Sequence, residues 1–147
     1  MKLRLLNHCI QVARSKVNSL EGELASMLDA VQSESKSTAG DKHETGRAMI
    51  HLEQEKLQKQ LAEAQSILAE LEQINPEHKL ETAQKGAVVQ TNRATFYIAV
   101  GLGKVNLNGT DIFVVSSQSP IAKQMLGKRL GESFNMNGTE YAITSIQ

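Results

Sequence analysis

Two acidic residues, Asp41 and Glu44, stand three positions apart in the polar stretch AGDKHETGRA at residues 39–48. If a helix begins in this stretch, residues three apart lie on one face, so the two carboxylates would point the same way. The spacing also fits a structural role, in which Asp41 caps a helix and Glu44 completes a capping box.

Long helix-forming segments flank this stretch. Upstream, apolar residues recur in steps of four and three, which predicts a helix that packs along its length against another helix. These residues are Leu6, Ile10, Ala13, Val17, Leu20, Leu24, Met27 and Val31. The downstream series is Ile50, Leu57, Leu61, Ala64, Leu68 and Leu71. Two such stripes joined by a short polar link predict an antiparallel helical hairpin, a coiled coil, with the carboxylates at its tip.

The pattern changes near Pro76, because the residue before a proline resists helical geometry. We expect the hairpin to occupy residues 1–75, a linker to occupy 76–86, and a small antiparallel β domain to occupy 87–147. Residues of the last segment are rich in the β-branched and aromatic types that favour strands. The fold class expected from this order is α+β.

Turn residues divide the β domain further. Asn-Gly pairs at 108–109 and 137–138 separate strand-like runs, which is typical of type I′ hairpins. Between them the segment SPIAKQMLGK predicts one short helix. Ser119 is placed to cap this helix, Pro120 fits its first turn, and Gly127 fits its end.

Bulk composition excludes several function classes. The 147 residues carry 16 basic and 16 acidic side chains, so no global attraction to nucleic acid or to an anionic membrane is indicated. The single cysteine, Cys9, rules out an internal disulfide, and its predicted place on a helix favours a partly buried hydrophobic role. Aromatic residues make up only 3% of the chain, which argues against an aromatic-lined pocket for a small-molecule substrate.

Localisation follows from the same features. The first residues lack the apolar core of a signal peptide, and no apolar run approaches the roughly 20 residues of a membrane span. We therefore expect a cytoplasmic protein with no membrane partner.

Residues 116–146, SSQSPIAKQMLGKRLGESFNMNGTEYAITSI, resemble the C-terminal signature of the bacterial Gre transcript-cleavage factors. That signature has a Ser-Pro-Ile-Ala opening, a small helix ending in Leu-Gly-Lys, and a Gly-acidic pair before the closing strands. The matching positions are Ser119, Pro120, Ile121, Ala122, Leu126, Gly127, Lys128, Gly131 and Glu132. The order of a helical hairpin followed by a small β domain is also similar to that family.

The resemblance implies an FKBP-like fold for the C-terminal domain and binding to RNA polymerase through its secondary channel. It implies that Asp41 and Glu44 help to hold a second Mg²⁺ in the polymerase active centre, where they act in trans. The chain would then stimulate transcript cleavage or modulate elongation as an accessory factor. It would not be an enzyme itself, and it would have no cofactor of its own.

The tip departs from the family pattern, which is Gly-Asp-Leu-x-Glu-Asn-x-Glu-Tyr. The Asn of that pattern is Thr45 here, its later Glu is Arg47, and its Tyr is Ala48. A positive charge beside the carboxylates weakens the recruitment of a cation. The chain could therefore be a Gre-like inhibitor that enters the channel without stimulating cleavage.

Four residues of the short helix, Ser119, Pro120, Ile121 and Met125, are candidates for polymerase contact or for the core. Basic residues lie near the start of the first predicted helix, namely Lys2, Arg4, Arg14 and Lys16. The resemblance implies that such a basic face can contact nascent RNA, although a solvated helix face is the simpler interpretation. A different class of function is a non-catalytic coiled-coil adaptor that pairs its apolar stripe with other helices. A monomer is expected for the accessory factor, whereas a tight dimer would favour the adaptor.

Overall fold

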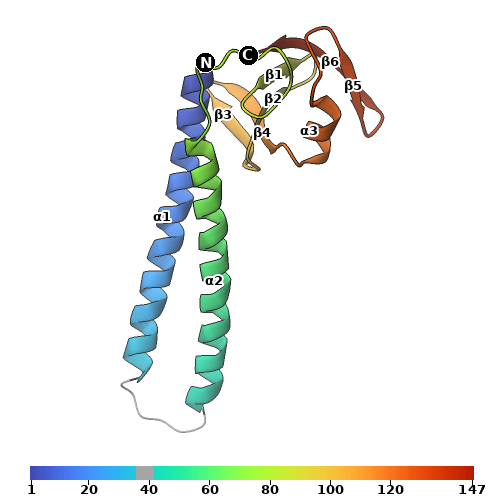
Figure 1. The fold of residues 1–147 in the computed structure, drawn as a ribbon. Coiled ribbons are helices and arrows are strands. Elements are labelled where there is room, and N and C mark those ends of the chain that lie inside the picture. Colours follow the sequence, from blue (N-terminus) through green and yellow to red (C-terminus); the bar gives the residue numbers. More distant parts are fainter. Residues whose placement is uncertain (36–41) are drawn as a thin grey trace. The chain divides into compact units, whose positions relative to one another are not determined.

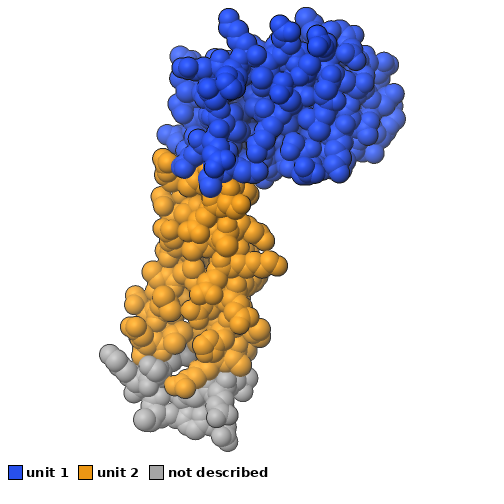
Figure 2. Space-filling view, in the orientation of Figure 1, with its two compact units in different colours: residues 1–11, 69–147 blue, residues 12–68 orange. Residues whose placement is uncertain are grey.

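The computed structural model describes residues 1–35 and 42–147 (Figure 1). Two long helices, α1 (Lys2–Ser35) and α2 (Lys42–Glu72), precede a six-stranded sheet and a short helix, so the predicted α+β class is confirmed. No helix within the described residues is both long enough and apolar enough to span a membrane. The chain divides into two compact units, one of residues 12–68 and one of residues 1–11 with 69–147 (Figure 2).

The unit of residues 12–68 is the paired part of α1 and α2, which run in opposite directions (Figure 1). Its core joins Val17 and Leu20 of α1 to Leu57 and Ala64 of α2. Leu24, Met27, Leu61 and Leu68 pack against this core and are partly buried. All eight residues belong to the two stripes seen in the sequence, so the predicted hairpin is confirmed here. Its stability comes from burial of these stripes rather than from helix propensity alone.

The sheet has the strand order β3-β4-β2-β1-β6-β5. The strands are β1 (Val88–Thr91), β2 (Thr95–Ala99), β3 (Gly103–Leu107), β4 (Thr110–Ser116), β5 (Ser133–Met136) and β6 (Thr139–Ile146). Four of its neighbouring pairs are antiparallel, as expected, but β2 and β4 are parallel, so the sheet is mixed. The β3–β4 hairpin places β4, with buried Ile112 and Val114, beside β2 and leaves the more exposed β3 at the edge.

Both predicted tight turns are present. Asn108 and Gly109 have positive φ angles of 53° and 85°, and Asn137 and Gly138 have 52° and 79°. A type I′ turn needs positive φ at both central positions, which asparagine and glycine adopt at little cost. These turns fix the registers Leu107 opposite Thr110 and Met136 opposite Thr139.

One face of the sheet carries the core of the β domain. This cluster contains Ala83, Ala87, Val89, Phe96, Ile98, Ala122, Met125, Phe134 and Ile143. Four aromatic rings extend across the same strands, with centroids 5.9 Å apart for Phe113–Phe96, 5.9 Å for Phe96–Tyr141 and 5.0 Å for Phe134–Tyr141. The few rings of this chain therefore serve mainly to hold the sheet together.

Helix α3 (Pro120–Met125) begins as the sequence predicts. The Ser119 hydroxyl oxygen accepts a hydrogen bond from the Ala122 backbone N–H at 3.3 Å and donates one to the Ser116 carbonyl at 2.6 Å. Pro120 lies in the first turn, where its missing N–H is harmless. The glycine after the helix, Gly127, has a φ of 82°.

We expect Ser119→Ala to lower the free energy of unfolding by about 1 kcal/mol, because one capping acceptor is lost. Chemical denaturation followed by circular dichroism measures this change. Ser133→Ala, at an exposed strand position, is the matched control and should change the unfolding free energy by less than about 0.5 kcal/mol. Equal effects of the two substitutions would contradict the capping role.

Candidate functional site

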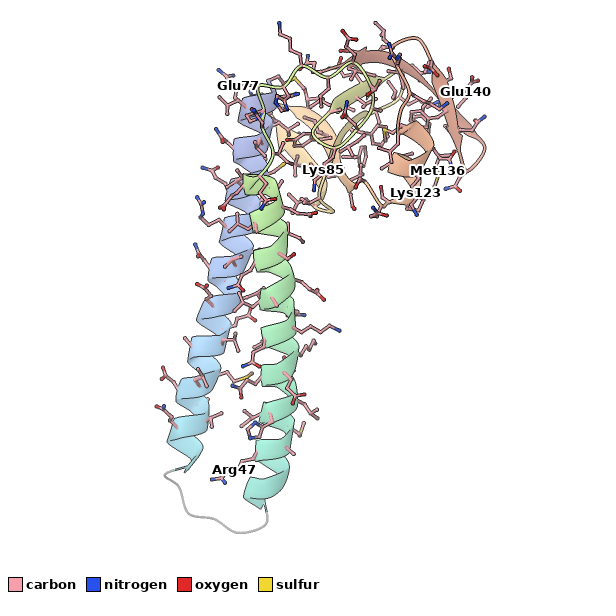
Figure 3. All side chains as sticks on the ribbon, in the orientation of Figure 1. Arg47, Glu77, Lys85, Lys123, Met136 and Glu140 are labelled. Atoms are coloured by element: carbon pink, nitrogen blue, oxygen red, sulfur yellow. The ribbon has the colours of Figure 1, made fainter. Side chains whose placement is uncertain are left out.

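The acidic tip lies at the boundary of the described residues. Asp41 falls outside them. Glu44 lies in the first turn of α2, but its side chain is not among those described. One turn further along α2, the Arg47 side chain is exposed to solvent (Figure 3). The residues that the structure describes contain no group of three or more metal-ligating side chains.

The four residues predicted for partner contact have different environments. Ser119 is the helix cap, and Pro120 is exposed. Ile121 is partly buried against the core of the β domain. Met125 is fully buried in that core, so it has no surface to offer to a partner. Of the two roles considered for Met125, the structure supports the core.

Exposed leucines lie in the segment immediately after α3, which the sequence analysis did not single out. Leu126 is 41% exposed and Leu130 is 64% exposed. Lys123 and Arg129 are also exposed in this segment, and Figure 3 shows Lys123 on α3. We refer to Leu126, Leu130, Lys123 and Arg129 as the 123–130 surface. The sequence LGKRLG at residues 126–131 could have indicated this exposure. A short turn that contains two glycines has few neighbours to bury the side chains of its leucines.

Backbone hydrogen bonds hold this surface in place. The Gly127 N–H donates to the Ala83 carbonyl and the Ala83 N–H donates to the Lys128 carbonyl, both at 2.8 Å. The Gly131 N–H donates to the Ile143 carbonyl at 3.0 Å. The segment is therefore an ordered platform, and binding to it would cost little conformational entropy. Exposed apolar side chains flanked by basic ones suit a protein partner with apolar and acidic groups.

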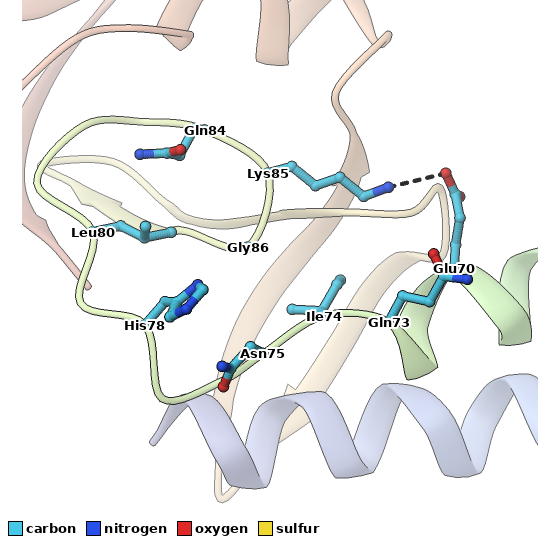
Figure 4. Close-up of a pocket in the computed structure, with 9 residues that line it drawn as sticks. All are labelled: Glu70, Gln73, Ile74, Asn75, His78, Leu80, Gln84, Lys85 and Gly86. Carbon is cyan, nitrogen blue, oxygen red and sulfur yellow. Dashed lines mark hydrogen bonds and ion pairs between the residues drawn. The ribbon is translucent and has the colours of Figure 1, made fainter.

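A concave region lies in the loop that follows α2. It has a volume of about 320 Å³, and Figure 4 shows the nine lining residues between Glu70 and Gly86. Lys85 Nζ and Glu70 Oε1 form an ion pair at 3.1 Å along its edge. Both side chains are about half exposed, so solvent screens the pair and its contribution to stability is small. The two charges already neutralise each other, which leaves no net charge to select an ionic ligand.

Cys9 and Tyr97 are fully buried in the unit that contains residues 1–11 and 69–147. Burial raises the pKa of the Cys9 thiol to about 11. Burial also raises the pKa of the Tyr97 hydroxyl, and the neighbouring Cys9 raises it further. A thiol with a raised pKa stays protonated at neutral pH, and full burial keeps it away from solvent, so Cys9 fits the hydrophobic role predicted for it.

The Tyr97 hydroxyl has no hydrogen-bond partner among the described residues. A buried hydroxyl without a partner loses its hydration and gains nothing in return. We therefore expect Tyr97→Phe to leave the unfolding free energy unchanged or to raise it by about 1–2 kcal/mol. Thermal and chemical denaturation measure this effect. Tyr141→Phe, at a partly exposed ring, should be close to neutral, and a loss above about 1 kcal/mol in Tyr97→Phe alone would overturn this account.

Comparison with known proteins gives structural similarity only. No protein-family model matches the sequence, and no curated protein matches it. The solved structures to which it is similar include three of Gfh1, a GreA factor homologue. The transcription factor Gfh1 aligns over 94% of this chain and 92% of its own, with 18% identity and a TM-score of 0.39. GreA factor homologue 1 of Thermus thermophilus aligns over 97% and 94%, with 17% identity and a TM-score of 0.36. Gfh1 of Thermus aquaticus aligns over 94% and 93%, with 16% identity and a TM-score of 0.35.

Proposed function

We propose that this chain is a Gre-like transcription regulator that binds RNA polymerase through its secondary channel. The observation that carries the proposal is the agreement between the 116–146 motif and its local structure. Ser119 caps α3, Pro120 opens it, and Gly127 and Gly131 take positive φ angles of 82° and 89°. The residues that resemble the Gre signature therefore have structural roles in this fold, as a helix cap, a first-turn proline and glycines with positive φ. A helical hairpin precedes this domain, as the resemblance requires.

In this proposal the hairpin carries Asp41 and Glu44 to the polymerase active centre. Two carboxylates are too few to hold Mg²⁺ alone but suit an ion whose remaining ligands come from the polymerase and water. A divalent ion held there can activate a water molecule and stabilise the departing oxygen when a phosphodiester is cleaved. The residues of this chain bind and orient, and the polymerase remains the enzyme.

The 123–130 surface is the proposed anchor on the polymerase. Its leucines supply apolar area, and Lys123 and Arg129 favour an acidic partner surface. Contact of the basic N-terminal residues with nascent RNA remains a prediction. A Gre-like channel inhibitor without cleavage activity would use the same anchor and differ only in what the tip does.

Binding to core bacterial RNA polymerase tests the proposal. The purified chain should co-elute with the polymerase from a size-exclusion column and compete with another secondary-channel ligand. Without the polymerase it should sediment as a monomer. A chain that never co-elutes with the polymerase and sediments as a tight dimer would favour the coiled-coil adaptor instead.

A further inference from the structure

Helix α2 carries a second stripe of side chains outside the hairpin core. Met49, Leu52, Lys56 and Lys59 are spaced three, four and three residues apart, so they lie on one helical face. All four are exposed, whereas the core stripe of the same helix uses Leu57 and Ala64. We refer to these four residues as the 49–59 stripe.

The apolar members of this stripe are unusual for their position. Met49 is 68% exposed and Leu52 is 66% exposed. The outer face of a paired helix is normally polar, because water covers it. Further along the same face of α2 the side chains are indeed charged, namely Lys56, Lys59 and Glu63. Two large apolar side chains at neighbouring turns therefore expose area that a partner could cover.

The small apolar area of the stripe limits which partners it can bind. A stable interface between two copies buries roughly 800 Å² on each partner, which is far more than two side chains supply. The stripe is therefore too small to hold a second copy alone, but it can strengthen a contact that is anchored elsewhere.

The charge of the stripe indicates which kind of partner surface it can bind. Lys56 and Lys59 form no ion pair with any residue that the structure describes. Their ammonium groups favour carboxylates, and the apolar pair beside them favours apolar side chains rather than phosphates.

From these observations we infer that the 49–59 stripe is a second docking surface, which binds an apolar and acidic protein surface of the RNA polymerase. The inference rests on the proposed function, since it assigns the stripe to the same partner as the 123–130 surface. The two surfaces lie in different units of the chain, so each can be altered without disturbing the other.

Titration of core polymerase with fluorescently labelled protein tests this inference. Met49→Gln with Leu52→Gln keeps good helix formers at both positions and removes the apolar area. We expect its Kd for the polymerase to rise about tenfold or more, since each 1.4 kcal/mol corresponds to a factor of ten. Lys56→Gln with Lys59→Gln should raise the Kd severalfold, with a larger effect at low salt. Leu3→Gln, at an exposed leucine of the other unit, should leave the Kd unchanged.

Each other result has a distinct meaning, provided that circular dichroism shows unchanged helix content. If the unaltered chain binds and Met49→Gln with Leu52→Gln binds equally well, the inference is wrong and the proposed function stands. If the unaltered chain does not bind, the proposed function is wrong. If only the lysine substitutions matter, and only when RNA is present, the stripe binds nucleic acid. If the substitutions instead convert a dimer into monomers, the partner that covers the stripe is a second copy of this chain.

Discussion

Replacing Asp41 by Asn and Glu44 by Gln together should abolish transcript shortening by this chain in stalled elongation complexes. Each substitution keeps the size of the side chain and removes its charge, so the tip can no longer share a divalent ion with the polymerase. Loss of a metal ion that stabilises charge in the transition state costs several kcal/mol, so we expect a fall in cleavage rate of about a hundredfold or more. Gel analysis of end-labelled transcripts measures the rate.

Binding to the polymerase supplies the control for this experiment. The doubly substituted chain should bind with an unchanged Kd, because the proposed docking surfaces lie elsewhere. Restoring the acidic residue of the family pattern with Arg47→Glu should raise the cleavage rate and lower the Mg²⁺ concentration needed. Shortening that continues at the same rate without the two carboxylates would remove them from the mechanism. If the unaltered chain blocks elongation without shortening transcripts, it is the inhibitor.

Met125→Ala should lower the free energy of unfolding of the β domain by about 2–5 kcal/mol. Met125 is fully buried in the cluster with Phe96, Phe134 and Ile143, so truncation leaves a cavity that its neighbours cannot fill completely. Urea denaturation followed by tyrosine fluorescence measures the change.

Leu130→Ala is the matched variant for this prediction. Leu130 lies five residues further along the chain but is 64% exposed, so its truncation should change stability by less than about 0.5 kcal/mol. The same substitution should weaken polymerase binding, because Leu130 belongs to the 123–130 surface. A destabilisation by Leu130→Ala as large as that by Met125→Ala would contradict the assignment of these residues to surface and core.

Features set by neighbouring residues could be predicted from the sequence. The apolar spacing of Val17, Leu20 and Leu24 predicted that these side chains pack in the hairpin core, because helical periodicity places them on one face. The Asn-Gly turns and the Ser119 cap were predictable for the same reason, since each depends on the φ angle or hydrogen bond of a few adjacent residues. The predicted domain boundaries at 75 and 87 stay predictions.

Features set by distant residues could not be predicted in this way. The parallel pairing of β2 with β4 depends on which strand of the later hairpin gains more from burial, and local pattern does not show this. The burial of Met125 and the exposure of Leu126 and Leu130 depend on how the 126–131 segment bonds to Ala83 and Ile143. Tyr97 lies near Cys9, which is far away along the chain, so the burial of its unpaired hydroxyl could not be predicted from neighbouring residues.

Photocrosslinking from the tip tests the central claim most directly. Cys9 is fully buried with a raised pKa, so His43→Cys can be labelled selectively with a photoactivatable thiol reagent in the folded protein. In a complex with RNA polymerase, we predict crosslinks to polymerase segments beside the catalytic Mg²⁺, and their loss when another secondary-channel ligand is added in excess. Crosslinks found only on the outer surface of the polymerase, or none above the level without polymerase, would contradict delivery of the tip to the active centre.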